Sequence, residues 1–415
     1  MTELKLTNDQ ENAFNAFVTF LADPVESVFV LEGYSGTGKS TLVGHILDKI
    51  PNLLKATKLI NPDTPEYELA LTATTNKAAE NLSNITGFGV STIHSYLCLT
   101  VRTDYKTGKT TLVPRSNEVK GNVILFIDEA SYIDSQLLGL IFKMTQKCKI
   151  VFMGDPAQLT PVQSSGTPPV FKAKFNGAKL KQVVRQAEGN PIQDVSTKFR
   201  ETVGTGEFFS FKPDGHHIQY MNRLDFNQAI LNEFSRPDWR HNHSKVLGWT
   251  NKCVIGYNNL IANSVKGNPE FQVNDYAVCN KRVVGKNYSL KTDQMVRITQ
   301  ISGPTEVYGA KGRHITLDST ITAFCPESLD ERKLAIARAK AAGDDRILAT
   351  IDEKWVDLRA AYSCTINKSQ GSTYDRVFID LDDIKRCNSG DQMARMLYVG
   401  VSRAREQVFL TGDIF

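Results

Sequence analysis

The sequence predicts an α/β protein in which parallel strands alternate with helices. Along the first 160 residues, four short apolar runs of the buried-strand kind alternate with helix-compatible stretches. Each run ends in a cluster of polar residues, and the first cluster is rich in glycine. Two further apolar runs near the C-terminus, 377–381 and 408–410, restore the pattern, so we expect a second α/β domain.

The glycine-rich cluster, Gly33 to Ser40, reads GYSGTGKS and fits the phosphate-loop pattern G-x-x-x-x-G-K-[ST]. The strand-like run 28–31 precedes it and the helix-compatible stretch 41–47 follows it. This order disfavours an ordinary glycine-rich turn, because a helix N-terminus next to inward-facing backbone N–H groups binds phosphate. We expect Lys39 to reach the β- and γ-phosphates and Ser40 to bind Mg²⁺. The candidate nucleotide contacts of this segment are Gly33, Ser35, Gly36, Thr37, Gly38, Lys39, Ser40 and Thr41.

A helix is expected just upstream, with apolar residues at helical spacing from Ala13 to Leu21. Thr7 and Gln10 fit a capping box at its start. Gln10 therefore has two interpretations: it caps this helix, or it contacts the adenine of a nucleotide held by the loop. The local sequence alone favours the cap.

Polar clusters follow the next three strand-like runs, at 74–77, 128–129 and 155–158. Ligands of parallel sheets bind at the carboxyl ends of the strands, so these clusters and the glycine loop predict one site. Asp128 is expected to hold Mg²⁺, Glu129 to orient the attacking water, and Gln158 to sense the γ-phosphate.

Two arginines are candidates for stabilising the transition state from across a cleft: Arg185 in LKQVVRQ and Arg403 in LYVGVSRAR. By itself, either arginine is more typical of a surface residue or a salt-bridge partner.

Residues 99–121 contain five lysines and arginines against two acidic residues, with a turn signal at 106–109 between strand-prone runs. We interpret them as a basic β-hairpin inserted in the first domain, with a solvated loop as the alternative. Short β-like runs over 271–320 predict a small β module, and Leu348 to Leu358 are expected to form a helix.

The bulk composition is that of an ordinary globular protein of two or three domains, with 415 residues and a net charge of +4. Seven cysteines, with no C-x-x-C pair, indicate reduced thiols and an intracellular location in the cytoplasm. No apolar stretch is long enough for a membrane span, and no signal-peptide pattern opens the chain. His241 and His243 lack accompanying ligands, so we expect a solvated loop there rather than a metal site.

The ordered set of motifs resembles superfamily 1 helicases, most closely the RecD-like branch with its phage helicases of the Dda type. The resemblance runs from Gln10 to Arg405. It rests on GYSGTGKS, TATTNKAA, STIHS, VILFIDEAS, GDPAQLTPV, LKQVVRQ, VLGWTNK, TINKSQGST and YVGVSRAR.

The resemblance implies two RecA-like domains with ATP and Mg²⁺ between them and single-stranded DNA across their top. The first domain would span 1–190, with a strand-separating pin at about 97–121. The second would combine 191–262 with 356–415, and an SH3-like β module would occupy 263–355.

Several site residues follow from the resemblance alone. Gln10 becomes the adenine contact, Arg185 and Arg403 become arginine fingers of the second domain, and Gln370 and Gly371 link the nucleotide and DNA sites. The implied DNA contacts are Thr74, Asn76, Thr92, His94, Asn251, Thr365, Lys368 and Ser369, with Tyr105 as the stacking residue of the pin. The sequence departs from the family at Asn76 and Asn367, where relatives often carry histidine.

The implied function is that of an ATP-dependent DNA helicase moving 5′→3′ as a monomer in replication or recombination. Its partners would be single-stranded DNA and its junctions with duplex, and a single-strand binding protein or replisome components. Three alternatives remain open: a translocase that displaces proteins without processive unwinding, an RNA helicase, and a P-loop kinase, which the paired arginines disfavour.

Overall fold

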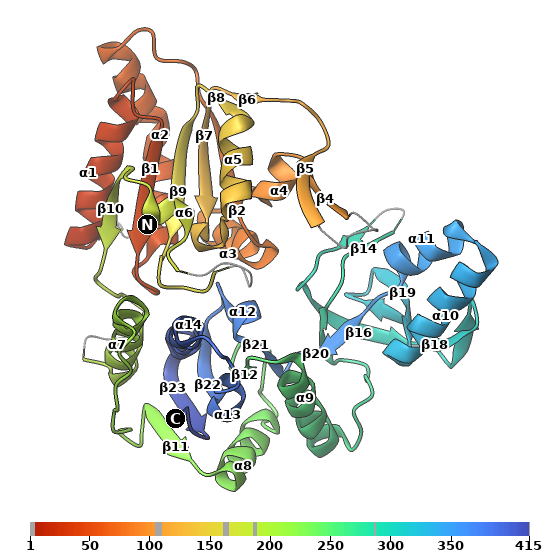
Figure 1. Ribbon diagram of the computed structural model, residues 1–415. Helices are drawn as coiled ribbons and strands as arrows, with labels where there is room; N and C mark the ends of the chain where they lie inside the picture. Colours follow the sequence, from red (N-terminus) through yellow and green to blue (C-terminus); the bar gives the residue numbers. More distant parts are fainter. Residues whose placement is uncertain (1–4, 104–109, 161–165, 186–188, 286–287, 415) are drawn as a thin grey trace.

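The computed structural model describes residues 5–103, 110–160, 166–185, 189–285 and 288–414. Two α/β domains and a smaller β module are arranged around a common junction (Figure 1). Both α/β domains contain a parallel sheet, which confirms the predicted fold class. Among the described helices, none combines the length and apolar character needed to cross a bilayer.

The first domain is built on a six-stranded sheet in which every neighbouring pair is parallel. In spatial order its strands are β10 (Asn176–Leu180), β1 (Val28–Gly33), β9 (Lys149–Gly154), β7 (Val123–Asp128), β2 (Glu68–Ala73) and β3 (Val90–Thr92). Its helices are α1 (Asn8–Ala22), α2 (Lys39–Ile60), α3 (Asn76–Thr86), α4 (Ile93–Tyr96), α5 (Ser135–Lys143) and α6 (Pro169–Lys172).

Strand β7 shows why the strands of this sheet appear in the sequence as continuous apolar runs. Ile124 and Phe126 pack into a core with α1 and α2, whereas Leu125 and Ile127 pack on the other face with α4, α5 and α6. Alternate side chains of a strand point to opposite faces, so a sheet covered on both sides needs apolar residues at every position.

The second domain has a five-stranded parallel sheet in the order β11 (Ile218–Met221), β23 (Ala404–Thr411), β22 (Tyr374–Asp380), β12 (Ser244–Gly248) and β21 (Ser363–Thr365). Its helices are α7 (Pro191–Thr205), α8 (Arg223–Phe234), α9 (Asn251–Lys266), α12 (Ile366–Ser369), α13 (Leu381–Ile384) and α14 (Gly390–Ser402). Helices α7 and α14 cover one face, and α8 and α9 cover the other.

The β module interrupts the second domain with an antiparallel sheet. Its strands are β13 (Tyr276–Cys279), β16 (Met295–Ile301), β17 (Thr305–Val307), β18 (Ala310–Leu317), β19 (Ile321–Pro326) and β20 (Leu358–Ala360), with a small hairpin of β14 (Val283–Val284) and β15 (Ser289–Leu290). Helices α10 (Leu329–Ala342) and α11 (Asp345–Lys354) pack on β18 and β19. The SH3-like assignment stays a prediction.

Two details correct the sequence interpretation. The helix expected from Leu348 to Leu358 ends at Lys354, because Leu358 opens β20. Since β20 pairs with β13, the module's sheet extends beyond residue 355, where the module was expected to end.

An antiparallel hairpin of β4 (Leu99–Thr103) and β5 (Thr110–Pro114) occupies the predicted insert. Leu99 packs in the first-domain core, and Gln136 Nε2 donates to Leu112 O at 3.2 Å, so the base of the hairpin is anchored. The hairpin leaves the first domain on the side of the β module (Figure 1). The short strands β6 (Lys120–Gly121) and β8 (Thr145–Gln146) pair with each other in parallel.

Candidate functional site

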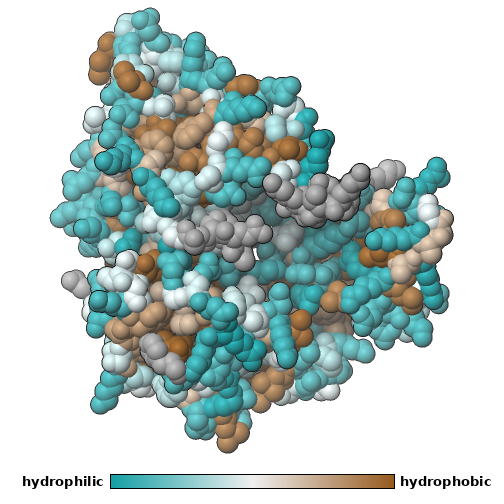
Figure 2. Space-filling view, viewed as in Figure 1, coloured by the Kyte–Doolittle hydropathy of each residue, from teal (hydrophilic) through white to brown (hydrophobic). Residues whose placement is uncertain are grey.

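A polar cleft of about 660 Å³ lies between the two α/β domains. On the visible face of the molecule, hydrophilic residues dominate around the recess where the domains and the module meet (Figure 2). The cleft is lined by six lysines and arginines against two carboxylates. These are Lys39, Lys77, Lys245, Arg185, Arg403 and Arg405, and Asp128 and Glu129. Such an excess of positive charge suits a polyphosphate.

The phosphate loop joins β1 to α2, as predicted. Gly36 and Gly38 have φ values of 81° and 75°, in the left-handed region that favours glycine. A Cβ at Gly38 would lie 2.6 Å from Gln10 Nε2, and one at Gly36 would lie 2.8 Å from Arg185 Cβ. Both glycines are therefore required by backbone conformation and by close packing.

Lys39 is the first residue of α2, and its ammonium lies over the loop, where it donates to Gly33 O at 2.7 Å and Tyr34 O at 2.9 Å. Burial lowers the pKa of Lys39, and the negative charges of Asp155, Glu129 and Asp128 oppose that shift. A desolvated cation at this point gives strong attraction to a phosphate.

Gln10 fulfils the capping interpretation and also touches the loop. Its N–H donates to Thr7 Oγ1 at 3.3 Å and its Oε1 accepts from Thr7 N at 3.0 Å, so the capping box is confirmed. Its Nε2 donates to Thr37 O at 3.1 Å. The side-chain amide keeps a free lone pair and a second N–H for a base edge, so the adenine contact remains a compatible prediction.

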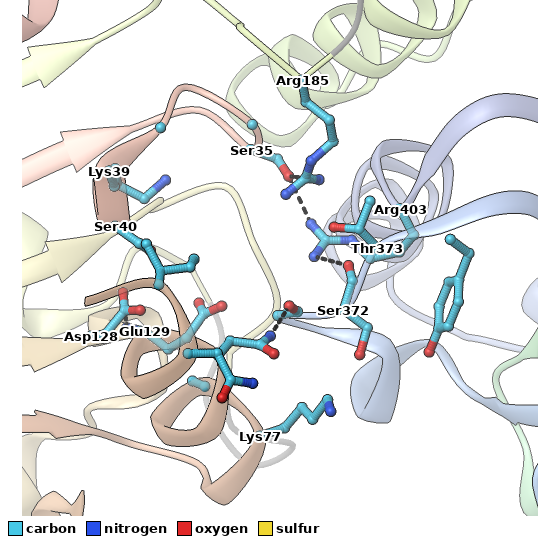
Figure 3. A pocket seen from close by; sticks show the side chains of 18 of the residues that line it. Ser35, Lys39, Ser40, Lys77, Asp128, Glu129, Arg185, Ser372, Thr373 and Arg403 are labelled. Atoms are coloured by element: carbon cyan, nitrogen blue, oxygen red, sulfur yellow. Dashed lines mark hydrogen bonds between the residues drawn. The ribbon is translucent and has the colours of Figure 1, made fainter. Parts of the chain in front are cut away.

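Asp128 and Glu129 stand at the carboxyl end of β7 (Figure 3). Glu129 has φ 54° and ψ 46°, and its N–H donates to Asp128 Oδ1 at 2.8 Å. Burial raises the pKa of Glu129 to about 7, the Asp128 charge adds to the shift, and Arg403 and Lys39 oppose it. A carboxylate tuned to this range suits a general base at neutral pH.

The donor set fits Mg²⁺. Ser40 in the first turn of α2 and Asp128 at the end of β7 both line the cleft, and they supply the hydroxyl and carboxylate oxygens that this hard cation prefers.

Gln158 and Gln370 meet across the cleft. Gln370 Nε2 donates to Gln158 Oε1 at 2.9 Å and lies 3.5 Å from Glu129 Oε2, and its Oε1 accepts from Tyr132 Oη at 2.6 Å. Gly371 follows with φ 77°, and its carbonyl accepts from Asn81 Nδ2 of α3. Through Gln370, the second domain thus contacts both the Glu129 carboxylate and the Gln158 side-chain amide of the candidate hydrolytic site.

The two arginines converge on Ser35 of the phosphate loop (Figure 3). Arg403 Nη2 donates to Ser35 Oγ at 2.7 Å, and Arg185 Nη1 donates to the same oxygen at 3.2 Å. Arg185 follows β10, so it belongs to the first domain, and the expectation that both arginines come from the second domain is wrong. It still reaches across the cleft, because Nη1 also donates to Ser402 O at 2.8 Å.

Sequence reasoning missed a buried network around Asp155. Tyr398 Oη donates to Asp155 Oδ2 at 2.5 Å and accepts from Ser35 N at 2.8 Å. Arg200 of α7 donates to Asp155 Oδ1 through Nε and Nη2 at 3.2 and 3.1 Å and stacks over the Tyr34 ring at 3.7 Å. The one sequence signal for Tyr398 is that it stands five residues before Arg403, in the same motif. No sequence signal marks Arg200 as part of the site.

The predicted DNA contacts of the first domain lie near one another but are tied to different elements. Thr74 Oγ1 donates to Glu129 O at 3.0 Å, and Asn76 Nδ2 lies 3.5 Å from Thr292 O in the β module. Thr92 caps α4, where Ser95 N donates to its hydroxyl at 3.2 Å, and burial lowers the pKa of His94.

In the second domain, Asn251 is exposed at the start of α9 and Thr365 caps α12. Lys368 Nζ lies 2.8 Å from Asp293 Oδ1 and donates to Asn280 Oδ1 at 3.0 Å, both in the β module. Ser369 is fully buried and donates to Ile366 O at 2.7 Å, so the expectation that its side chain touches DNA is corrected: it stabilises α12. Tyr105 lies outside the described residues.

Residues 5–222, more than half of the chain, match the AAA domain family, and residues 360–411 match the UvrD-like helicase C-terminal domain.

The chain is 25% identical to the ATP-dependent DNA helicase dda of Enterobacteria phage T4 over 466 residues, covering 99% of this chain and 100% of that protein. It is 32% identical to the ATP-dependent RecD2 DNA helicase of Deinococcus radiodurans over 165 residues, which cover 39% of this chain and 20% of the relative.

Among solved structures, the fold is similar to the crystal structure of Pif1 helicase from Bacteroides in complex with ADP-AlF3 and ssDNA. The TM-score is 0.55 at 15% identity, and the match covers 100% of this chain and 94% of that chain. The shared fold is the predicted pair of RecA-like domains.

Proposed function

Because the chain belongs to the AAA domain family and is a superfamily 1 DNA helicase of the Dda, RecD and Pif1 type, which hydrolyses ATP, we propose that it moves 5′→3′ along single-stranded DNA and separates the duplex ahead. One observation carries the proposal: Gln370 and Arg403 of the second domain reach Glu129, Gln158 and Ser35 of the first. Hydrolysis at such a shared site changes the contact between the domains.

Nucleotide binding would fall to the first domain. Backbone N–H groups of the phosphate loop and Lys39 would hold the phosphates, and Gln10 would contact adenine. Ser40 and Asp128 would hold Mg²⁺, which supplies charge neutralisation at the β- and γ-phosphates when bound. Glu129 would orient and deprotonate the attacking water.

Arg403 and Arg185 would stabilise charge on the transferring phosphoryl group. An arginine in this role is worth roughly 10³–10⁵ in rate. Because Arg403 comes from the second domain, only a closed cleft would be fully active, and loss of the γ-phosphate would weaken closure.

DNA would run across the face that carries Asn76 and Thr92 of the first domain and Lys368 and Asn251 of the second. Contacts to backbone phosphates are independent of sequence and sensitive to salt. Alternating grip by the two halves would turn cleft opening and closing into steps along the strand.

The decisive experiment compares unwinding of duplexes with a 5′ tail and a 3′ tail in the presence of ATP. We expect unwinding of the 5′-tailed substrate, ATPase stimulation by DNA above that by RNA, and no hydrolysis by Lys39→Ala. Preference for a 3′ tail would contradict the proposed polarity. Equal stimulation by RNA would contradict the DNA track, and retained hydrolysis by Lys39→Ala would contradict the whole assignment.

A further inference from the structure

Ser35 is a phosphate-loop residue whose polar groups both contact the second domain. Its N–H donates to Tyr398 Oη at 2.8 Å, and its Oγ accepts from Arg403 Nη2 at 2.7 Å. The same Oγ accepts from Arg185 Nη1 at 3.2 Å. Ser35 is also nearly buried, with 9% of its surface exposed, so these contacts are shielded from water.

The hydroxyl of Ser35 is not explained by phosphate binding. Ser35 occupies an x position of G-x-x-x-x-G-K-[ST], and such loops hold phosphates through backbone N–H groups, a lysine and the final hydroxyl. Alanine or glycine at this position would satisfy the pattern equally well. The hydroxyl oxygen therefore has a different task, and its two donors indicate which.

The two arginines need a shared acceptor because their charges repel. Burial lowers the pKa of Arg185 to about 9, and the neighbouring Arg403 charge adds to the shift, so Arg185 remains charged at neutral pH. A hydroxyl oxygen has two lone pairs and can accept from both guanidinium groups at once. Figure 3 shows the Ser35 side chain next to the guanidinium groups of Arg185 and Arg403.

Each of the two arginines donates a hydrogen bond to the domain on the opposite side of the cleft. Arg185 of the first domain donates to Ser402 O of the second at 2.8 Å, whereas Arg403 of the second domain donates to Ser35 of the first. Arg403 is further fixed by Val399 O at 3.1 Å and Ser372 O at 3.2 Å. Ser35 is thus the one acceptor that both guanidinium groups share among the described hydrogen bonds.

We propose that Ser35 is a positioning residue, whose hydroxyl aligns Arg185 and Arg403 for ATP hydrolysis while Tyr398 fixes its backbone. The inference rests on the proposed function, since it assumes that the arginines act on the transferring phosphoryl group. It adds a role for a loop side chain that nucleotide binding does not require.

The test is Ser35→Ala, with Ser27→Ala as a control at an exposed position directly before β1. ATP turnover is measured with saturating single-stranded DNA, and ADP affinity is measured by calorimetry. We expect kcat to fall about tenfold, because misplacing a group by about 1 Å costs up to 10² in rate. ADP affinity should stay within twofold, because the backbone N–H groups remain, and Ser27→Ala should match the wild type.

A second measurement repeats Ser35→Ala in an Arg403→Lys background. If the hydroxyl acts through the arginines, Ser35→Ala lowers kcat by a smaller factor in the Arg403→Lys background than in the wild type. A kcat within twofold of wild type for Ser35→Ala overturns the proposal. So do equal losses of kcat and ADP affinity, or full additivity with Arg403→Lys. Failure of the proposed function itself is distinguishable, because the wild type would then show no DNA-stimulated hydrolysis.

Discussion

Glu129 adopts a left-handed backbone conformation that is uncommon for a residue other than glycine, asparagine or aspartate. Such a conformation costs about 1–3 kcal/mol and persists only where the surroundings enforce it. Here the Glu129 N–H donates to Asp128, and its carbonyl accepts from the Thr74 hydroxyl. The strained turn points the carboxylate into the cleft between the two domains, where a base would be needed.

Replacing Glu129 with glutamine should therefore remove the base without changing the shape of the site. We expect kcat for ATP hydrolysis to fall about 10²–10⁴-fold, the range for loss of a general base. ATP affinity should change only a few-fold, and the melting temperature should not fall, because a buried charge is removed. Turnover within tenfold of wild type would show that another group activates the water.

His241 predicts a pH dependence of stability. Burial lowers the pKa of His241 to about 4, the charges of Lys245, Lys77 and His243 add to the shift, and Glu80 opposes it. The pKa is about 6.5 in an unfolded chain, so between pH 6.5 and 4 the unfolded state binds a proton that the folded state refuses. Stability is present above pH 6.5 and is lost as pH falls through this window.

His241→Phe keeps a ring against Tyr276 but cannot be protonated. Since the histidine is partly exposed, we discount its effect for screening to about 1 kcal/mol at pH 5. The wild type should then lose about 2–4 °C more than the variant between pH 7 and pH 5. Equal shifts in thermal melting scans would contradict the assignment.

The residues of the phosphate loop were predictable because they lie together in sequence and their chemistry is local. Gln10 was only half predictable, since its cap depends on Thr7 but its contact with Thr37 O spans the fold. Tyr398 was missed because an aromatic residue on an apolar helix is more typical of a core.

At the scale of elements, the β4–β5 hairpin is anchored in the first-domain core at its base, and the pin predicted from the sequence includes Tyr105, which lies outside the described residues. We expect a deletion of residues 104–109, or Tyr105→Ala, to preserve DNA-stimulated ATPase activity and to reduce duplex separation at least tenfold. Stacking on an aromatic ring is worth about 1–3 kcal/mol per base, enough for such an effect. Unwinding at the wild-type rate would contradict the pin and favour another strand-separating element.

Helix α12 presents Lys368 to the β module, where Asp293 holds its ammonium. If Lys368 binds a DNA phosphate, Lys368→Ala should weaken single-strand binding for all sequences and reduce the salt slope of log K by about 1. Asp293→Asn should strengthen single-strand binding at low salt, because it releases the Lys368 ammonium from its ion pair. Asn tolerates the φ of 64° at this position, so the fold is retained. Unchanged affinity in fluorescence titrations of both variants would exclude Lys368 from the track.

The long strands were predictable from their apolar runs, because burial on both faces leaves little choice of residue type. The end of α11 was not, since Leu348, Ile351 and Trp355 keep a helical spacing that continues to Leu358. The chain leaves the helix there because Leu358 pairs with β13 through strand β20, a partner almost 80 residues away.

Across the whole molecule, buried polar contacts join the two α/β domains, beside the apolar packing of Ala157 and Leu159 on the second-domain core. Arg395 of α14 donates to Pro156 O at 2.6 Å and Gln158 O at 2.7 Å, and Arg200 of α7 pairs with Asp155. Hydrogen bonds to charged groups contribute about 1.5–3 kcal/mol each, and a few of them can be exchanged without exposing a core. The sequence could not show these pairs, because each joins residues separated by 45 positions or more.

Gln370 is a cross-domain contact through which we expect DNA binding to be coupled to nucleotide hydrolysis. It ends α12, the helix that carries Lys368, and its amide contacts Tyr132, Gln158 and Glu129 of the first domain. A shift of α12 on binding a strand would therefore move a group that is bonded to the hydrolytic site. This is a contiguous physical link, and its strength can be measured as a coupling free energy.

Gln370→Ala should lower the ratio of ATPase rates with and without single-stranded DNA about tenfold, a coupling loss of about 1.4 kcal/mol. DNA affinity should stay within twofold, because Gln370 is buried and the surface of α12 remains. Lys368→Ala is the matched comparison, since it should lower DNA affinity and leave the maximal stimulation at saturating DNA in place. If Gln370→Ala keeps the full stimulation ratio, the signal between the two sites must run through another contact, and the Asp155 network with Arg200 and Tyr398 is then the next one to break.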